Sequence, residues 1–131
     1  DLINKLDLKV KKYSPRKNSI FKNFKINEIP HYDDPKHVDF TFEVKIEPFK
    51  RAMNEIKPEI WFTNIRKGQT EFRDNQDIFS FSKEGLLKVS PFYYWTDNRL
   101  DYYLKENNLK NNLRYFDPTK VLANRECGLH N

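Results

Sequence analysis

The residues most able to do chemistry lie between His31 and Asp39, where histidines and aspartates are closely spaced. Imidazole and carboxylate groups suit zinc, manganese or iron, and a loop can fold several of them onto one ion. The residues that would hold such an ion are His31, Asp33, Asp34 and His37. On the alternative interpretation the aspartates hydrogen-bond their own turn while the histidines are solvated. We prefer that alternative, so neither a metal site nor a cofactor is expected.

A second arrangement is the triplet Glu43-Val44-Lys45, which on a strand would place a carboxylate and an amine on the same face. Metal-dependent nucleases of the restriction type use such a Glu-x-Lys, in which carboxylates bind magnesium and the lysine positions the attacking water. Together with Asp33 and Asp34, it would make a small metal-dependent nuclease or hydrolase. A strand with alternating charges on its solvated face gives the same triplet, so we prefer a solvated face and predict no catalytic residue.

The positive charge of the chain is concentrated in its first quarter. Residues 1–30 contain eight basic and three acidic groups, whereas residues 31–131 contain sixteen of each. Cations neutralise phosphates, and exposed aromatic side chains stack on unpaired bases. The residues expected to bind nucleic acid or another polyanion are Lys9, Lys11, Lys12, Arg16, Lys17, Lys22 and Lys25. The alternative is that these cations form the solubilising outer face of two strands.

Several familiar motifs are missing. Gly68, Gly85 and Gly128 are too far apart for a phosphate-binding loop or a dinucleotide fingerprint, so no nucleotide cofactor is expected. Cys127 is the only cysteine, which excludes an internal disulfide and fits a reducing compartment. No apolar run approaches the roughly 20 residues that span a bilayer. We therefore expect an intracellular, cytoplasmic protein that does not contact a membrane.

The element expected to organise the fold is a strand over residues 37–49. Apolar residues occupy alternate positions there, which is typical of an antiparallel strand with one buried face. These residues are Val38, Phe40, Phe42, Val44 and Ile46. The same alternation predicts strands at residues 6–10, 20–26 and 60–65.

Two further patterns complete the expected elements. Phe79 and Phe81, followed by a glycine turn and then Leu87 and Val89, predict a β-hairpin. Apolar residues at helical spacing predict helices at about 49–57 and 97–113, the second capped by Thr96.

Together these elements predict a mainly β fold at the border of the α+β class. We expect a mostly antiparallel sheet, folded as a sandwich or half-barrel, with one or two helices packed against it. Residues 1–131 suit a single domain, which could be excised from a longer protein. The predicted function is a non-enzymatic recognition module that binds a protein or a nucleic acid through its sheet and its basic N-terminal quarter. We prefer this interpretation to the enzymatic alternative.

Overall fold

The computed structural model describes residues 2–21, 28–111, 117–120, 126 and 129. The chain divides into two compact units, Asp1–Ile56 and Lys57–Asn131, which are described separately. The expectation of a single domain over residues 1–131 stays a prediction. Within the described ranges, no helix is long and apolar enough to cross a membrane.

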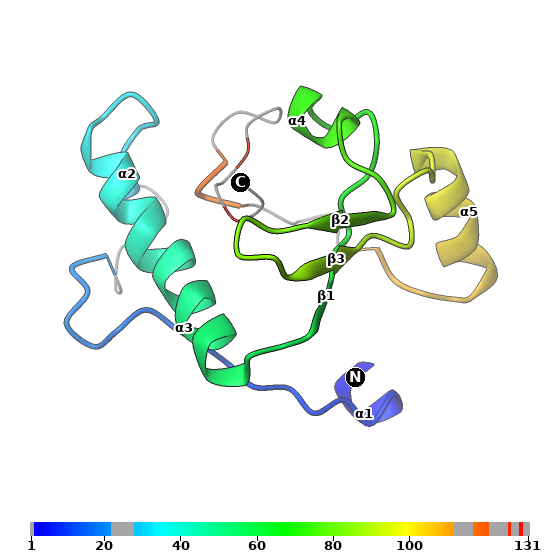
Figure 1. Ribbon diagram of the computed structural model, residues 1–131, viewed down its shortest axis with the longest axis horizontal. Helices are drawn as coiled ribbons and strands as arrows, with labels where there is room; N and C mark the ends of the chain where they lie inside the picture. Colours follow the sequence, from blue (N-terminus) through cyan, green and yellow to red (C-terminus); the bar gives the residue numbers. More distant parts are fainter. Residues whose placement is uncertain (1, 22–27, 112–116, 121–125, 127–128, 130–131) are drawn as a thin grey trace. The chain divides into compact units, whose positions relative to one another are not determined.

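The first unit is built on a continuous helical run through α2 (Lys36–Thr41), η2 (Phe42–Ile46) and α3 (Glu47–Ile56), drawn in cyan and green in Figure 1. Asp34 and Pro35 precede the run. The Asp34 carboxylate accepts a hydrogen bond from the Lys36 N–H at 2.8 Å. Proline fixes φ at a value that suits the first helical turn. This pair of residues therefore starts the helix.

The prediction of a strand over residues 37–49 is wrong, because these residues are helical. His37 and Phe40, three residues apart, are buried on one side of α2, whereas Val38 and Phe42 are 67% and 49% exposed. Alternating β-branched and aromatic residues favour a strand only where a sheet is available to bury one face. Here the helix start at Asp34-Pro35 outweighs that tendency.

The π-helical segment η2 is explained by Pro48. Proline has no N–H, and its ring clashes with the carbonyl four residues earlier, here that of Val44. In η2 the Glu47 N–H donates to the Phe42 carbonyl, five residues back. This wider turn lets the helix continue through Pro48. The helix expected at 49–57 consequently begins two residues earlier, as α3.

An extended N-terminal segment follows the short helix α1 (Leu2–Lys5) and lies against α3. Glu55 accepts hydrogen bonds from Lys11 and from the Tyr13 hydroxyl, the latter at 3.0 Å. Arg51 donates to the Ser14 carbonyl at 2.7 Å. These contacts, rather than strand pairing, hold the segment. The strand expected at residues 6–10 does not form, and most of the one expected at 20–26 lies outside the described residues.

A second ion-pair network lies nearby on α3. Arg51 donates to both carboxylate oxygens of Glu47, at 2.9 and 3.1 Å, and the Arg16 Nε donates to one of them at 2.9 Å. The hydrogen bonds from Arg51, reinforced by Arg16, lower the pKa of Glu47 to about 2, against the opposing effect of burial.

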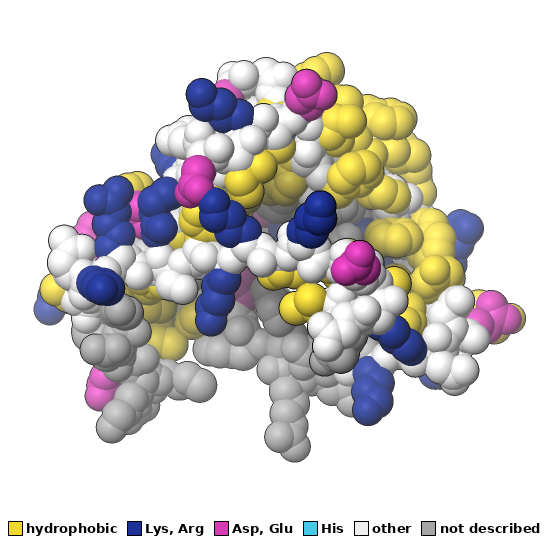
Figure 2. Space-filling model, turned by 90° about the horizontal axis from the view of Figure 1, so that it is seen from below, with side chains coloured by type: hydrophobic (Ala, Val, Ile, Leu, Met, Phe, Trp, Pro, Cys, Tyr) yellow, Lys and Arg dark blue, Asp and Glu magenta, His cyan; other side chains and the backbone are white. Residues whose placement is uncertain are grey.

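Figure 2 shows one face of the molecule, on which Lys and Arg side chains are interspersed with acidic and hydrophobic ones.

The second unit contains a three-stranded sheet in the order β1–β3–β2, with β1 at Ile60–Phe62, β2 at Phe79–Phe81 and β3 at Leu87–Val89. β1 is parallel to β3, and β2 is antiparallel to β3. The expected hairpin is present as β2 and β3, with Gly85 at a φ of +82° in its turn. Helix α4 (Glu71–Asp74) lies between β1 and β2 in sequence, and α5 (Asp97–Glu106) follows β3 (Figure 1).

The expectation of a mainly β, mostly antiparallel sandwich or half-barrel is therefore wrong. The described residues form an α+β fold with one mixed sheet, in which the crossover containing α4 and β2 allows the parallel β1–β3 pair. The helix expected over 97–113 is α5, which starts after the Thr96 cap and ends at Glu106. Asn108 takes a φ of +51°, which stops the helix there.

Candidate active site

The best-organised polar cluster lies where β1 and β3 end. Because the two strands are parallel, their carboxyl ends meet at one edge of the sheet, where open α/β sheets bind ligands. The hydroxyls of Thr63 and Ser90 are 2.8 Å apart, and the Lys67 N–H donates to the Tyr93 carbonyl at 2.9 Å. These bonds join the segments that follow the two strands. We refer to residues 63–70 as the carboxyl-edge loop.

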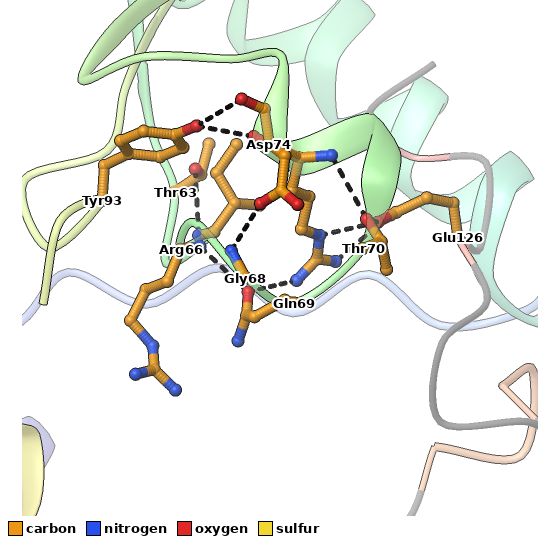
Figure 3. Close-up of polar contacts among 10 residues, drawn as sticks. Thr63, Arg66, Gly68, Gln69, Thr70, Asp74, Tyr93 and Glu126 are labelled. Atoms are coloured by element: carbon orange, nitrogen blue, oxygen red, sulfur yellow. Dashed lines mark hydrogen bonds and ion pairs between the residues drawn. The ribbon is translucent and has the colours of Figure 1, made fainter. Parts of the chain in front are cut away.

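The carboxyl-edge loop is closed against α4 by side-chain oxygens (Figure 3). Gly68 has a φ of +81°, a conformation that favours glycine, and its N–H donates to the Asp74 carboxylate at 2.5 Å. The Gln69 side-chain oxygen accepts from the Arg66 N–H at 2.9 Å and from the Arg73 Nη1 at 2.6 Å. The loop therefore has a defined shape before any ligand binds.

This loop and the helix that follows it carry three cations, namely Arg66, Lys67 and Arg73. The Arg66 side chain, 14% exposed, donates to the Trp95 carbonyl at 3.2 Å and to Asp97 at 2.5 Å. Lys67 is exposed, and among the described residues it forms no ion pair. An exposed ammonium can bind an oxyanion.

The third cation, Arg73, is paired with Glu126. The Arg73 Nη2 donates to the carboxylate at 3.2 Å, and Nε lies 2.7 Å from it as an ion-pair contact without hydrogen-bond geometry. The Thr70 hydroxyl donates to the same carboxylate at 2.6 Å (Figure 3). Burial by itself would raise the pKa of Glu126, but the hydrogen bonds from Thr70 and Arg73 lower it overall. Glu126 is therefore held as a carboxylate.

Tyr93 lies on the other side of the polar cluster from Glu126 and holds α4 through its hydroxyl (Figure 3). It is 1% exposed, and its hydroxyl donates to the Arg73 carbonyl at 2.7 Å and to the Asp74 carbonyl at 3.3 Å. Burial, with the charges of Asp74 and Asp77, raises the pKa of the phenol. Tyr93 thus remains a protonated donor that fixes α4 to the segment after β3.

Lys88, in β3, is another buried cation near this edge. It is 2% exposed and lies in register with Trp61 and Ser80. Burial lowers the pKa of its ammonium, and the charge of Glu84 partly opposes this.

The residues of the metal alternative do not gather around one point. His31 and Asp33 are 2.5 Å apart, and this hydrogen bond lowers the pKa of Asp33. Asp34 instead binds the first turn of α2, and the buried His37 has its Nδ1 2.8 Å from the Pro30 carbonyl. Over the described ranges, no three His, Cys, Asp or Glu side chains lie together as a metal would require.

The prediction that Glu43 and Lys45 lie on the same face of a strand is wrong, because this segment is helical. Both residues lie in η2, where positions two apart do not share a face. Glu43 accepts a hydrogen bond from the Ser19 hydroxyl. Asp33 and Asp34 precede α2 and are not on a neighbouring strand. The strand geometry on which the nuclease alternative depends is absent from these residues.

The proposed polyanion-binding residues lie along the extended N-terminal segment. Lys11 and Arg16 are paired with Glu55 and Glu47, so part of their charge is neutralised within the unit. The other described members, all exposed, are Lys9, Lys12 and Lys17. Two members, Lys22 and Lys25, lie outside the described residues.

Comparison with known proteins gives consistent matches. A sequence model of the phosphoadenosine phosphosulfate reductase domain matches residues 1–117. The phosphoadenosine 5'-phosphosulfate reductase of Buchnera aphidicola subsp. Acyrthosiphon pisum (strain 5A) is 28% identical over 116 residues, covering 71% of this chain and 47% of that protein. The enzyme of the same name from Vibrio cholerae serotype O1 (strain ATCC 39541) is 37% identical over 65 residues, covering 50% and 25%.

A solved structure agrees with these sequence matches at the level of the fold. The crystal structure of phosphoadenylyl-sulfate reductase from Candida auris, a phosphate complex, superposes with a TM-score of 0.50 at 24% identity. The superposition covers 62% of this chain and 40% of that one. The described residues thus form an α+β fold, with a loop that carries cations at the carboxyl edge of the sheet. The chain belongs to the phosphoadenosine phosphosulfate reductase domain family. It spans less than half the length of the relatives named here.

This family corrects the function inferred from the sequence. The non-enzymatic recognition module, the preference against an enzyme and the binding of nucleic acid are wrong, because the family is one of reductases. The nuclease alternative is replaced for the same reason. Charge asymmetry describes non-specific attraction and does not define a function, so it was a weak guide.

The sequence interpretation also missed the residues of the carboxyl-edge loop. A signal for them exists, because Arg66, Lys67 and Gly68 directly follow a strand, where a glycine turn commonly presents ligand-binding groups. Glu126 gives no comparable signal. Its partner Arg73 is 53 residues away, and only the folded structure brings the two together.

Proposed function

We propose that this chain provides the anion-binding edge and the reactive thiol of a phosphoadenosine phosphosulfate reductase. The family match over residues 1–117, a range that includes the carboxyl-edge loop, supports the anion-binding part of the proposal. The thiol part rests on Cys127, the only cysteine among residues 1–131. The relatives are named for phosphoadenosine 5'-phosphosulfate, a nucleotide whose phosphate and phosphosulfate groups are anionic. The nucleotide is accordingly a substrate, not a cofactor.

The cations of the loop supply the charge that such a substrate needs. Lys67 is exposed and available. Arg66 is paired with Asp97, but the Asp97 side chain is 84% exposed, and a solvated ion pair of this kind contributes little. A phosphate or sulfate oxygen can therefore replace Asp97 on the guanidinium, whose planar donors match an oxyanion.

The reduction itself requires two electrons, and Cys127 is the only thiol of the sequence. The thiolate is the nucleophilic form of cysteine. Attack of its Sγ on the sulfur forms an S–S bond and breaks the bond from sulfur to the phosphate oxygen. Phosphoadenosine phosphate leaves with that electron pair, and the sulfo group stays on Cys127.

The second half of the reaction requires a reductant, and we assign this role to a dithiol. One thiolate of a dithiol attacks Sγ, and sulfite leaves with the S–S electron pair. The other thiolate of the dithiol then displaces Cys127, which regenerates its thiolate and oxidises the dithiol to a disulfide. The protein partner is accordingly a dithiol reductant. The cytoplasmic location expected from the sequence stays a prediction.

Calorimetric titration with phosphoadenosine phosphate tests the binding step without the chemistry. We expect the wild type to bind it and Lys67→Gln to bind at least tenfold more weakly, since a hydrogen bond to a charged group contributes about 1.5–3 kcal/mol. The matched control is Lys83→Gln, an exposed lysine in the β2–β3 turn, which is expected to bind as the wild type does. Absence of binding to the wild type, or equal losses in both variants, would contradict the proposal.

A further inference from the structure

We infer that Asp97 sets the affinity for the nucleotide by competing with it for Arg66. Its carboxylate pairs with the guanidinium while the site is empty, and an anionic group of the nucleotide replaces it on binding. The inference rests on the proposed function and adds to it a residue that weakens nucleotide binding. It starts from the Arg66 side chain, which points away from Thr70 and Glu126 in Figure 3.

Arg66 is held in place by uncharged groups of the protein. Its N–H donates to the Gln69 side-chain oxygen at 2.9 Å, and its Nη1 donates to the Trp95 carbonyl at 3.2 Å. The Arg66 side chain is 14% exposed, so most of its surface is covered. Amide oxygens accept hydrogen bonds without neutralising a cation. The guanidinium is therefore fixed in position and keeps its charge for an anion.

Asp97 supplies that anion through a pair that is open to water. The Asp97 Oδ1 lies 2.5 Å from the Arg66 Nη2, while the Asp97 side chain is 84% exposed. By contrast, Arg51 donates to both oxygens of Glu47, whose side chain is 20% exposed. A solvated ion pair is screened by salt and contributes little to stability. Asp97 can consequently leave Arg66 at a small cost.

The position of Asp97 in α5 lowers this cost further. Asp97 is the first residue of the helix, directly after the Thr96 cap, whose hydroxyl accepts a hydrogen bond from the Arg99 N–H at 3.3 Å. A negative side chain in the first turn of a helix interacts favourably with the helix dipole. After its release from Arg66, the Asp97 carboxylate is therefore both solvated and electrostatically favoured where it stands.

Competition of this kind raises the apparent Kd of the nucleotide. The nucleotide binds the form of the protein in which Arg66 is free of Asp97. The apparent Kd is the intrinsic Kd divided by the fraction of the protein in that form. Removal of the Asp97 charge is therefore expected to tighten binding.

A competing explanation is that Asp97 orients the guanidinium for the nucleotide and stays in contact with it. The two explanations predict opposite signs. A carboxylate that orients Arg66 strengthens nucleotide binding, so its removal weakens that binding.

Four variants and one control separate these effects. Asp97→Asn keeps the size of the side chain and removes its charge. Asp97→Glu keeps the competing carboxylate and is expected to bind the nucleotide more weakly than Asp97→Asn. Arg66→Gln, alone and combined with Asp97→Asn, completes a double-mutant cycle. The control Asp101→Asn removes an equal charge from an exposed position one turn further along α5.

The quantity measured is the Kd of phosphoadenosine phosphate, by calorimetry at two salt concentrations. We expect Asp97→Asn to bind roughly threefold to sixfold more tightly than the wild type, and Asp101→Asn to bind as the wild type does. In the Arg66→Gln background, Asp97→Asn is expected to change Kd no further, because the guanidinium is absent. Added salt is expected to reduce the gain in Asp97→Asn, since an exposed pair is screened.

Unchanged binding in Asp97→Asn would overturn the competition and leave the proposed function intact. Weaker binding would overturn it in favour of the orienting role. An equal gain in Asp101→Asn, or the same gain in the Arg66→Gln background, would overturn it in favour of general charge repulsion. Absence of binding by the wild type would overturn the proposed function, and the role of Asp97 with it.

Discussion

Arg73 and Glu126 are 53 residues apart in the sequence, yet the Arg73 Nε lies 2.7 Å from the Glu126 carboxylate in a pair that is almost fully buried. This contact fixes residue 126, directly before the only cysteine, to the helix that follows the carboxyl-edge loop.

The pair is expected to contribute strongly to stability. Glu126→Ala leaves Arg73 buried without its partner, and we expect the free energy of unfolding to fall by about 3 kcal/mol. Glu71→Ala, on the exposed side of α4, is expected to change it by less than about 0.5 kcal/mol. Urea denaturation of the two variants measures the difference, and equal midpoints would contradict the burial of the pair.

Low pH is expected to destabilise the first unit, because it protonates Glu47. The pKa of Glu47 is about 2 in the folded protein, against an ordinary value of 4.5. A carboxylate whose pKa is lowered by folding stabilises the fold above pH 4.5, and this contribution is lost as the pH falls from 4.5 to 2. Glu47→Gln is therefore expected to lower the Tm at pH 7 and to have no effect near pH 2.

Thermal melts of the wild type and Glu47→Gln between pH 2 and 7 measure this dependence. The control Glu59→Gln changes an exposed carboxylate for which the structure shows no ion pair within the described residues. A Tm difference between the wild type and Glu47→Gln that persists unchanged at pH 2 would show that the ion pairs with Arg51 and Arg16 do not set it.

Two phenylalanines of the helical run test its orientation. Phe40 is 3% exposed and packs edge-to-face on Phe21 at 5.5 Å between ring centroids, whereas Phe42 is 49% exposed. Phe40→Ala is expected to cost about 3–5 kcal/mol, and Phe42→Ala much less. A strand over residues 37–49 would bury both on one face. Similar losses in denaturation experiments would therefore favour the strand.

Tyr93 and Tyr94, which follow β3, test whether the buried hydroxyl of Tyr93 stabilises α4. Tyr93→Phe removes a buried hydroxyl that donates to the Arg73 carbonyl, and is expected to cost about 0.5–1.5 kcal/mol. Tyr94 is 57% exposed, so Tyr94→Phe is expected to change stability by less than about 0.5 kcal/mol. If chemical denaturation ranks the two variants in the opposite order, the assignment of Tyr93 as the supporting residue is wrong.

The fold could be predicted from the sequence where local signals act alone. The β2–β3 hairpin and the start of α5 at Thr96 follow from turn and capping residues, whose effect does not depend on distant partners. The region around Phe40 could not, because its alternating pattern is compatible with a strand and the deciding signal is the short Asp34-Pro35 start.

The site was predictable only in part. Arg66 and Lys67 follow a strand and precede a glycine, a local pattern that the sequence displays. The roles of Arg73 and Glu126 depend on a contact between segments that are distant in sequence. The spacing of apolar residues along the chain does not predict such a contact. The clustered histidines and aspartates near residue 31 have the composition of a metal site. Asp34, however, accepts a hydrogen bond from the first turn of a helix.

The most direct test of the proposed function is the intact mass of the protein after incubation with phosphoadenosine phosphosulfate in the absence of any thiol reductant. We predict that the wild type gains the mass of one sulfo group, that peptide mapping places it on Cys127, and that Cys127→Ser gains none. An unchanged mass of the wild type, or an equal gain in Cys127→Ser, would contradict it.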